Sequence, residues 1–405
     1  MTILVAPAKQ QISLLDVLTD EGLRLFFPLG ALYAALWPFL WVVVLGFDLP
    51  LARQVPATQW HPHEMLIGAY GAALIGFVTS AVPEWTDTKG PGQWMLLSLA
   101  ALWGIGRCVG VLGFDLVGVL GALADSLWLA GLLIYVAHVS WRRRTTSLTG
   151  FGFWLAVLVV AEVVTRVGFV GGDVQLSARG LAVVELAFLG LLSLALARVW
   201  VPVTNLVLDP SEKTSPYRPH PGRQNLASGL VAIALGGELA GLSTEVRGYL
   251  FLASGAAFLD RAGEAFIGRL FLRAETLSLF GSAALAGMGL LAVGAARLGA
   301  PLAESTALHV ALMGGLGLGV LAVYSVAGLL HTGHALRLPP AAMLSFLLLL
   351  AAAGLRVLPD LGVSIPLPGG HHVASSIAWA LAFLVWLYGY WPLLRDPHTV
   401  GRRSC

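Results

Sequence analysis

The chain consists of long apolar stretches joined by short polar connections. A helix that spans a membrane needs about 20 mostly apolar residues, and twelve such stretches follow one another along the sequence. The predicted spans lie near Phe26–Phe47, His63–Val82, Trp94–Leu112, Leu116–Val139, Phe151–Val170, Gly180–Trp200, Leu226–Leu242, Gly248–Leu270, Leu277–Leu298, Leu308–Leu330, Ala341–Leu358 and His372–Leu393. This pattern predicts an all-α polytopic membrane protein with about twelve transmembrane helices and no soluble domain.

One polar stretch is longer than the others and divides the chain. Val203–Gln224 contains four prolines, which is typical of a loop. We therefore expect a single membrane domain over 1–405 that begins with an interfacial segment at 1–25. Helices 1–6 are expected in 26–200, a cytoplasmic loop in 201–225, helices 7–12 in 226–394 and a tail in 395–405.

Composition supports the membrane assignment and excludes several other classes. Only 11% of the residues are charged, against about 25% in soluble domains, and the mean hydropathy is +0.82. The net charge is +2, so a nucleic-acid partner is not expected. Cys108 and Cys405 lie far apart, which argues against a disulfide, a zinc ribbon or covalently attached haem.

The distribution of positive charge predicts the orientation of the chain. The termini and the even-numbered loops hold sixteen of the 24 Lys and Arg residues, whereas the odd-numbered loops hold four. Because cytoplasmic loops are enriched in these residues, both termini are predicted to face the cytoplasm. The start of the second, tenth and twelfth spans would then lie at the outer face.

Histidines gather at the ends of these spans. Neutral imidazole is a usual ligand of haem iron and of copper, so convergence of histidines from three helices indicates a haem or metal site. The alternative is that histidines collect at interfaces because they tolerate half-polar surroundings. The candidate ligands are His61, His63, His309, His371 and His372 at the outer face and His331 and His334 at the inner face.

The segment Trp60–Met65, WHPHEM, is the strongest local motif. Pro62 suits the first turn of a helix, so the helix is expected to begin between His61 and His63. Only such a start would let both reach one site, because residues two apart do not share a helix face. Glu64, near the positive helix end, could orient a ligand histidine or carry a proton as a catalytic group.

Ionisable residues inside the spans are costly and call for partners. Glu162 and Arg166 are four residues apart and are predicted to pair. Asp125 has no expected partner within one helical turn. Arg107 could bind a haem propionate, since its planar fork suits carboxylates, or it could extend to the interface.

Small residues recur on two of the histidine-bearing spans. They provide close helix packing in membranes, but they could equally present a flat face to a porphyrin. They are Gly68, Ala72 and Gly76 in the second span, and Gly314, Gly315, Gly317 and Gly319 in the tenth.

These motifs together resemble a known family. WHPHEMLIGAYGAALIGFVTSAVPEW (Trp60–Trp85) is similar to the NnrS-family signature W-H-x-H-E-M, followed by a Gly/Ala-rich helix and A-V-P-x-W-T. Later segments resemble further family motifs in the same order: WGIGRC with Arg107, ARVWVPVTN, HVALMGGLGLGVLAV, LLHTGHAL and YGYWPLL. The resemblance covers nearly the whole chain.

The resemblance carries functional expectations. NnrS-family proteins are twelve-helix bacterial membrane proteins that contain haem and copper and are associated with nitric oxide and denitrification. It therefore implies one or two b-type haems, possible copper, nitric oxide as the ligand acted on, and a place in the bacterial inner membrane. The electron donor would be a quinol or a redox protein. The ligands and supporting residues that it implies are His61, His63, His309 and His331, with Glu64 and Arg107.

The chain also departs from the family pattern. The ninth span, TLSLFGSAALAG, lacks the family's histidine, and His334 replaces the arginine of G-H-T-G-R. Leu25 stands where a basic residue usually precedes the aromatic pair that begins at Phe26. One haem or metal site is thus expected to be altered or absent, and His371 or His372 could replace the missing histidine.

Three functions remain open at this point. The first is reduction of nitric oxide to nitrous oxide at a His-ligated haem. The second is binding of nitric oxide, haem or copper without turnover. The third is transport of a metal or haem, which a division into six and six spans would suit.

Overall fold

A computed structural model describes residues 12–49, 55–112, 118–363 and 366–401, and it is helical with no strand among them. The first half comprises α1 (Leu14–Leu18), α2 (Gly22–Pro38), η1 (Phe39–Val44), α3 (Ala57–His63), η2 (Glu64–Tyr70), α4 (Gly71–Thr86), α5 (Gln93–Leu112), α6 (Gly118–Arg143), α7 (Thr149–Gly171) and α8 (Val174–Leu208). The second half comprises α9 (Arg223–Leu239), α10 (Thr244–Ala262), α11 (Ala274–Arg297), α12 (Glu304–Leu308), η6 (His309–Leu316), α13 (Gly317–Leu330), α14 (Pro340–Val357) and α15 (Gly370–Leu394). The all-α polytopic prediction is confirmed.

Ten helices within the described residues are long and apolar enough to cross a membrane. The other two predicted spans correspond to α9 and α10, which are shorter or less apolar. The expected helix Gly248–Leu270 ends at Ala262, where two short 3-10 turns, Gly263–Ala265 and Gly268–Leu272, replace it. The expected loop from Val203 starts later, because α8 continues through Pro202 to Leu208.

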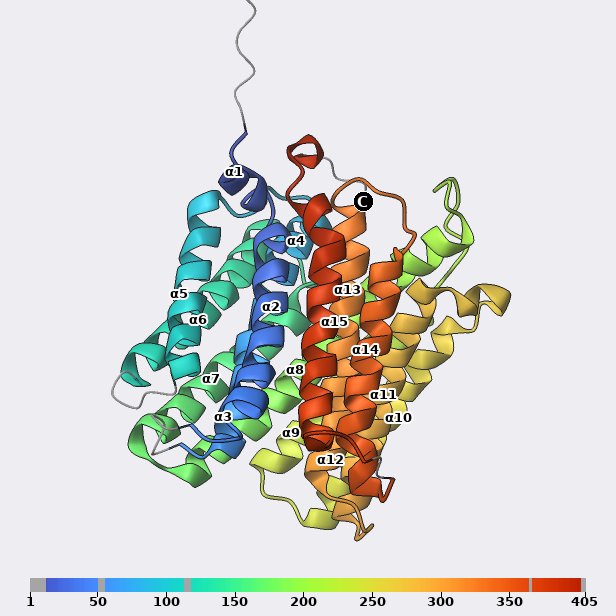
Figure 1. The fold of residues 1–405 in the computed structure, drawn as a ribbon. Coiled ribbons are helices and arrows are strands. Elements are labelled where there is room, and N and C mark those ends of the chain that lie inside the picture. The colour runs from blue at the N-terminus through green and yellow to red at the C-terminus, as the bar shows by residue number, and fades with distance from the viewer. Residues whose placement is uncertain (1–11, 50–54, 113–117, 364–365, 402–405) are drawn as a thin grey trace, which may run out of the picture.

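The first and last parts of the described chain, α1 and Gly401, lie at the same end of the bundle. Figure 1 shows α1 beside the last turns of the chain, and the backbone N–H of Gly401 donates to Asp20. Buried Arg24 in α2 donates to the carbonyl oxygens of Leu394, His331 and Thr399. This arrangement is what an even number of crossings requires, and the compartment that this end faces remains a prediction.

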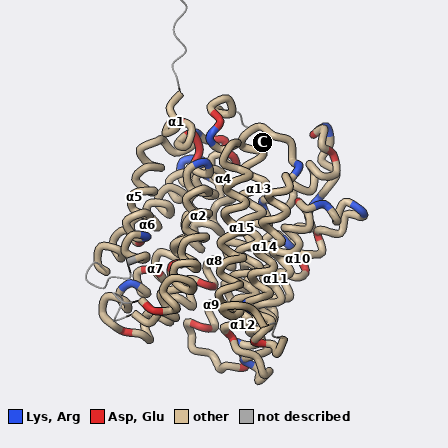
Figure 2. Tube along the Cα trace, in the orientation of Figure 1, with Lys and Arg blue, Asp and Glu red and all other residues tan. Residues whose placement is uncertain are grey.

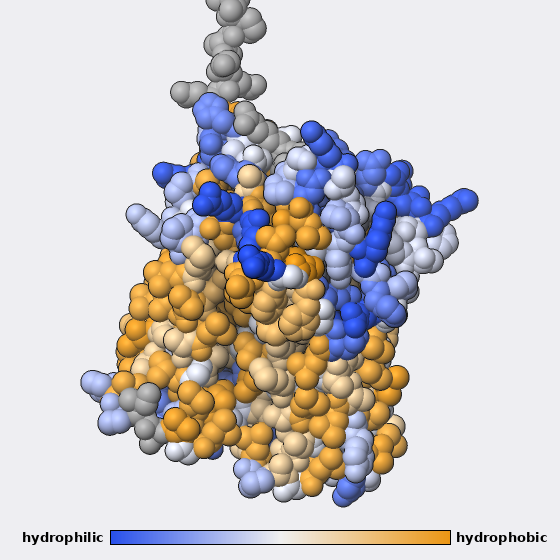
Figure 3. Space-filling model, turned by 90° about the vertical axis from the view of Figure 1, so that its right-hand side faces the viewer, coloured by the Kyte–Doolittle hydropathy of each residue, from blue (hydrophilic) through white to orange (hydrophobic). Residues whose placement is uncertain are grey.

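The surface has the pattern of a membrane protein. Figure 2 shows charged residues mainly near the two ends of the bundle, and Figure 3 shows a broad apolar belt below a hydrophilic end. Large apolar side chains are exposed along the outer helices, for example Ile134 on α6, Val160 on α7 and Leu347 on α14, each at least 64% exposed. Such exposure suits contact with lipid.

Tight packing holds the bundle together. Large aromatic side chains fill the space between helices: Trp37, Trp128, Trp154, Trp200, Trp379 and Trp386 are all fully buried. Elsewhere small residues bring backbones into contact, and a Cβ added at Gly255 of α10 would lie 2.6 Å from the carbonyl oxygen of Gly287 of α11. α10 is therefore an integral part of the bundle although its sequence is less apolar.

Candidate functional site: two cavities and a buried ionic network

The first cavity lies at the end of the bundle away from α1 and has a volume of about 440 Å³. Histidines from three separate helices line it: His61 of α3, His309 at the start of η6 and His372 of α15. We call it the histidine cavity. The predicted convergence is thus found for three of the five histidines assigned to the outer face.

Two of these histidines have rings with a defined orientation. His61 stacks on Trp41 with centroids 4.1 Å apart, and its buried Nδ1 has no hydrogen-bond partner among the described residues. Nδ1 of His309 lies 2.6 Å from the carbonyl oxygen of Ser305. Because a carbonyl only accepts, this contact places the proton on Nδ1 and leaves the lone pair of a neutral ring on Nε2.

π-Helical turns surround the histidine cavity. η1 ends the first spanning helix, whereas η2 and η6 each interrupt one, and all three contribute residues to the cavity wall. Pro38 immediately precedes η1, and Pro62 lies two residues before η2. Neither proline has a backbone N–H that could continue the α-helical hydrogen bonds. The hydroxyl of Tyr70 in η2 donates to the carbonyl of Leu312 in η6 at 2.9 Å. Such turns are frequent at functional sites.

The cavity also holds sulfur and charged groups. Met65 and Met313 line it, each four residues after one of the cavity histidines. The charged residues Glu185 of α8 and Arg356 of α14 also line it, and Arg356 donates to Asp360 at 2.8 Å. Imidazole suits copper and haem iron, and thioether sulfur suits Cu(I).

His63 belongs to a different site, so the expectation that it shares one with His61 is wrong. Nδ1 of His63 lies 2.9 Å from Glu64, and its Nε2 lies 2.9 Å from Glu162. The helix begins at Ala57, not at Pro62, so both histidines are inside α3 and point in different directions. Both ring nitrogens of His63 are occupied by carboxylates.

A fully buried ionic network surrounds His63. Arg107 donates to Asp125 at 2.7 Å and to Glu64, and Arg166 donates to Glu162 at 2.9 Å and to Asp125. The hydroxyl of Tyr33 and the indole of Trp128 add hydrogen bonds to Glu64 and Asp125, respectively. Oxygen and nitrogen atoms of His63, Asp125 and Glu162 come within 4.8 Å of one another. The Arg166 guanidinium is the cation that bridges the two carboxylates.

The contacts in this network test several predictions made from the sequence. The Glu162–Arg166 pair is confirmed, whereas Asp125 has both arginines and Trp128, one turn away, as partners. Arg107 does not extend to the interface, because it is only 4% exposed. Neither Arg107 nor Glu64 lines the histidine cavity.

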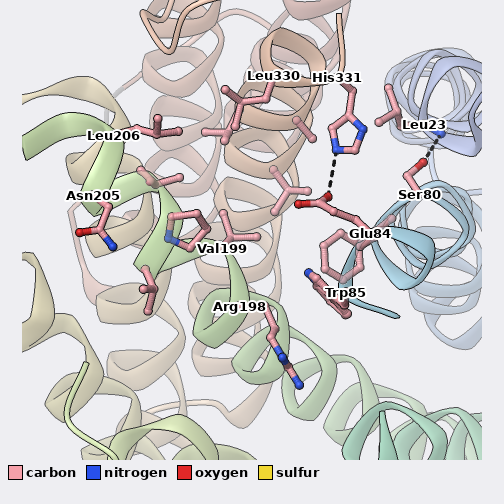
Figure 4. A pocket seen from close by; sticks show the side chains of 18 of the residues that line it. Leu23, Ser80, Glu84, Trp85, Arg198, Val199, Asn205, Leu206, Leu330 and His331 are labelled. Atoms are coloured by element: carbon pink, nitrogen blue, oxygen red, sulfur yellow. Dashed lines mark hydrogen bonds and ion pairs between the residues drawn. The ribbon is translucent and has the colours of Figure 1, made fainter. Parts of the chain in front are cut away.

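The second cavity, of about 460 Å³, lies at the end that carries α1 (Figure 4). Nδ1 of His331 lies 3.0 Å from Glu21, and its Nε2 lies 3.6 Å from Glu84. We call it the Glu84 cavity. His334, which is not among the cavity's lining residues, turns its Nδ1 to the hydroxyl of Thr332 at 2.9 Å. His309 and His331, at opposite ends of one span, therefore line opposite cavities.

A small void lies between the two cavities. Its volume is about 60 Å³ and its walls are almost wholly apolar. It shares Tyr70 with the histidine cavity and Phe77 and Val323 with the Glu84 cavity. The three spaces thus follow one another along the seam between the two halves of the chain.

The comparison with protein families agrees with this arrangement. The family model described as NnrS protein matches residues 17–398. The chain belongs to the NnrS family. This membership connects it with haem- and copper-related membrane proteins linked to nitric oxide. No curated protein and no solved structure matches the chain.

The small residues of this NnrS protein serve helix packing. A Cβ at Gly68 would lie 2.7 Å from Arg107, and one at Gly76 would lie 2.9 Å from Phe27. At Gly315 it would lie 2.5 Å from the backbone nitrogen of Ala286. At these positions the packing interpretation is confirmed, because neighbouring helices already occupy the space that a porphyrin would need.

Sequence reasoning missed several residues of the two cavities. The spacing His-x-x-x-Met occurs at His61 and again at His309, a repeat that could have identified Met65 and Met313. Glu84 is the variable position of the A-V-P-x-W-T motif, so the motif alone does not indicate its role. Glu21, Trp41 and Arg356 carry no local signal, since their roles come from contacts with distant helices.

Proposed function

We propose that this NnrS protein holds a b-type haem, with copper as a second candidate metal, in the histidine cavity and reduces nitric oxide to nitrous oxide there. One observation carries the proposal: three histidines from three helices face a single intramembrane cavity, and the buried Nδ1 of His61 has no partner among the described residues.

The residues present fit such a group. An unpaired polar atom in a buried place costs about 1–3 kcal/mol, and a metal ion or haem iron would satisfy the His61 nitrogen. The hydrogen bond from Nδ1 of His309 to the carbonyl of Ser305 leaves the lone pair of Nε2 available to bind a metal. Met65 and Met313 add thioether donors that suit copper, and about 440 Å³ lies within the usual range of ligand pockets.

The proposed reaction is 2 NO + 2 e⁻ + 2 H⁺ → N₂O + H₂O. The bound haem or copper would supply a site for the gas and for electrons, which come from a quinol or a one-electron redox protein. Trp41, Leu308 and Trp379 lie in the cavity wall, where their apolar side chains would limit access of water to the bound group. We assign proton delivery to Glu185, the glutamate that lines this cavity. Glu64 instead positions His63.

The test is spectroscopy of purified variants. His61→Ala and His309→Ala should lose most of the haem, whereas His220→Ala, in the exposed polar loop, should retain it. Spectra are recorded oxidised, reduced and reduced with nitric oxide, together with metal analysis. Normal haem content and spectra in both cavity variants would contradict the assignment. Haem that binds nitric oxide without turnover would indicate a binding protein rather than a reductase.

One observation favours transport as a second candidate function. Two large cavities lie at opposite ends of one seam with only a small void between them. The substrate sites of many transporters lie at such an interface between two halves of the fold. Copper or haem uptake by proteoliposomes tests this candidate. Uptake that persists in the absence of a reductant and is abolished by His309→Ala would favour transport over reduction.

A further inference from the structure

The Glu84 cavity lies between the two halves of the chain, at the end of the bundle that carries α1. Helices α2, α4 and α8 of the first half and α13 of the second half contribute to its walls. Figure 4 shows the carboxylate of Glu84 directed towards His331, with Asn205 on the opposite side. The cavity is therefore a defined space with polar groups on two sides.

Most of the wall is apolar or aromatic. Phe27 comes from α2 and Phe77 from α4, and Val199, Pro202 and Val323 come from α8 and α13. The ring of Trp85 also lines the space, 5.1 Å from the guanidinium carbon of Arg198. Apolar walls with a few placed polar groups are typical of sites for organic ligands, and the aromatic residues suit a flat ring.

The polar groups offer complementary hydrogen bonds. Glu84 and His331 are 3.6 Å apart, longer than a hydrogen bond, and the other ring nitrogen of His331 is held by Glu21. The side-chain oxygen of Asn205 accepts from the backbone N–H of Tyr217 at 2.8 Å, which leaves its NH₂ group to donate. One side of the cavity can thus accept from a hydroxyl while the other donates to an oxygen.

Charge narrows the class of ligand further. The carboxylates Glu84, Asp209 and Glu212 line the cavity, whereas Arg198 already donates to the carbonyl of Ser147 at 2.7 Å. Hydrogen bonds from Ser211 hold the pKa of Asp209, which lies in the loop, at about 2. An anionic headgroup would meet like charges, and a hydrated cation would meet apolar walls. A neutral ring that bears hydroxyl groups satisfies both conditions.

We propose that the Glu84 cavity binds a membrane quinol. One quinol hydroxyl donates to Glu84 beside His331, and the opposite oxygen of the ring accepts from Asn205. Binding in the cavity stands on its own geometry, whereas the destination of the electrons rests on the proposed function. With that function the balance is QH₂ + 2 NO → Q + N₂O + H₂O. The two O–H bonds of the quinol break, and its two electrons reduce nitric oxide.

The distance between the cavities suits this role. Tyr70 lines the histidine cavity and Phe77 lines the Glu84 cavity, seven residues later in the same span. At 1.5 Å per residue their backbones are about 10 Å apart along the helix axis. The quinol ring and the cofactor would therefore lie on either side of the small apolar void.

The experiment is photolabelling of the haem-loaded protein in lipid nanodiscs with an azido-benzoquinone. The label should appear on peptides of α4 and α8 that contain Glu84 or Asn205, and unlabelled decyl-benzoquinone should compete. Glu84→Gln should reduce labelling about tenfold, the loss expected for one hydrogen bond to a charged group. Val199→Trp, which fills the cavity, should reduce it as well. Asp87→Asn, fully exposed just beyond α4, is the matched control and should label normally.

The outcomes separate this inference from the proposed function. Labelling elsewhere, labelling that quinone does not displace, or unchanged labelling in both cavity variants would overturn the quinol site. If an artificial reductant drives nitric oxide reduction but no label enters the cavity, the inference fails and the function stands. If the label enters as expected but no donor supports turnover, the binding site stands and the function fails.

Discussion

The buried ionic network permits a quantitative test at Arg166. This side chain is 2% exposed and bridges two carboxylates, donating to Glu162 at 2.9 Å and to Asp125. Arg166→Gln removes the positive charge and leaves three buried carboxylates to share one arginine and His63. The change acts inside the membrane domain, where water cannot replace the lost partner.

The expected magnitude follows from burial. Removing one partner of a buried ion pair costs about 3–5 kcal/mol, a large part of the 5–15 kcal/mol that typically stabilises a folded protein. We therefore expect Arg166→Gln to lower the free energy of unfolding by about 3 kcal/mol or more. Asp260→Asn weakens the ion pair with Arg223 and serves as the control, because the side chain of Arg223 is 32% exposed and that of Asp260 is 42% exposed. That control should cost less than about 1 kcal/mol.

A double-mutant cycle makes the test specific to charge. Asp125→Asn combined with Arg166→Gln removes one charge of each sign, so the net charge of the network does not change. The loss in the double variant should be smaller than the sum of the single losses by about 0.5–3 kcal/mol. Unfolding is followed by circular dichroism in mild detergent as denaturant is added.

Two results would refute this reasoning. The first is a loss in Arg166→Gln no larger than that of Asp260→Asn, which would mean that the network contributes little to stability. The second is strict additivity in the double variant. Additivity would show that Arg166 and Asp125 act independently despite their contact.

Two further predictions concern packing and the loop between the halves. Gly315→Val should lower the free energy of unfolding by about 1–3 kcal/mol, measured in the same titration, because the added carbons meet the backbone of Ala286. Asp209→Ala should speed hydrogen exchange at the amides of Ser211 and Thr214, both of which donate to Asp209. Since these bonds lower the pKa of Asp209 from 3.8 to about 2, their stabilising effect should be complete above pH 3.8. It should disappear as the pH falls through about 2, and an effect lost already at neutral pH would contradict the assignment.

Hydropathy located the spans but not their ends. Each predicted span corresponds to a helix, because lipid forces the backbone to satisfy its hydrogen bonds within the segment. The helix start predicted at Pro62 was wrong, because Pro62 lies inside α3, and α8 likewise continues through Pro202 beyond the predicted end of its span. Prolines are tolerated in spanning helices because neighbouring groups and local π or 3-10 turns satisfy the freed carbonyls, and a single sequence does not show those neighbours.

Contacts within one helix were predictable, whereas contacts between helices were not. The i, i+4 pair Glu162–Arg166 follows from spacing alone. The partnership of Asp125 with Arg107 joins α5 and α6 and depends on how the helices turn towards each other. For the same reason the sequence indicated that histidines gather at one end, but it did not show which of them share a cavity.

The histidine cavity and the ionic network both include a residue of α3. We infer from this connection that the network supports the geometry of the cavity. His61 faces the histidine cavity, and His63, two residues later, is held between Glu64 and Glu162. Buried ion pairs are weak contributors to net stability, and their best-attested role is to specify one arrangement. Here we infer that the arrangement specified is the rotation of α3, which sets the direction of the His61 Nδ1 atom, a nitrogen without a partner among the described residues. A ligand held in place before its metal arrives needs such support from a second layer of contacts. If the histidine cavity holds haem as we propose, Arg166→Gln should therefore weaken haem binding although His61 is intact, and the haem content of the purified variant measures this effect.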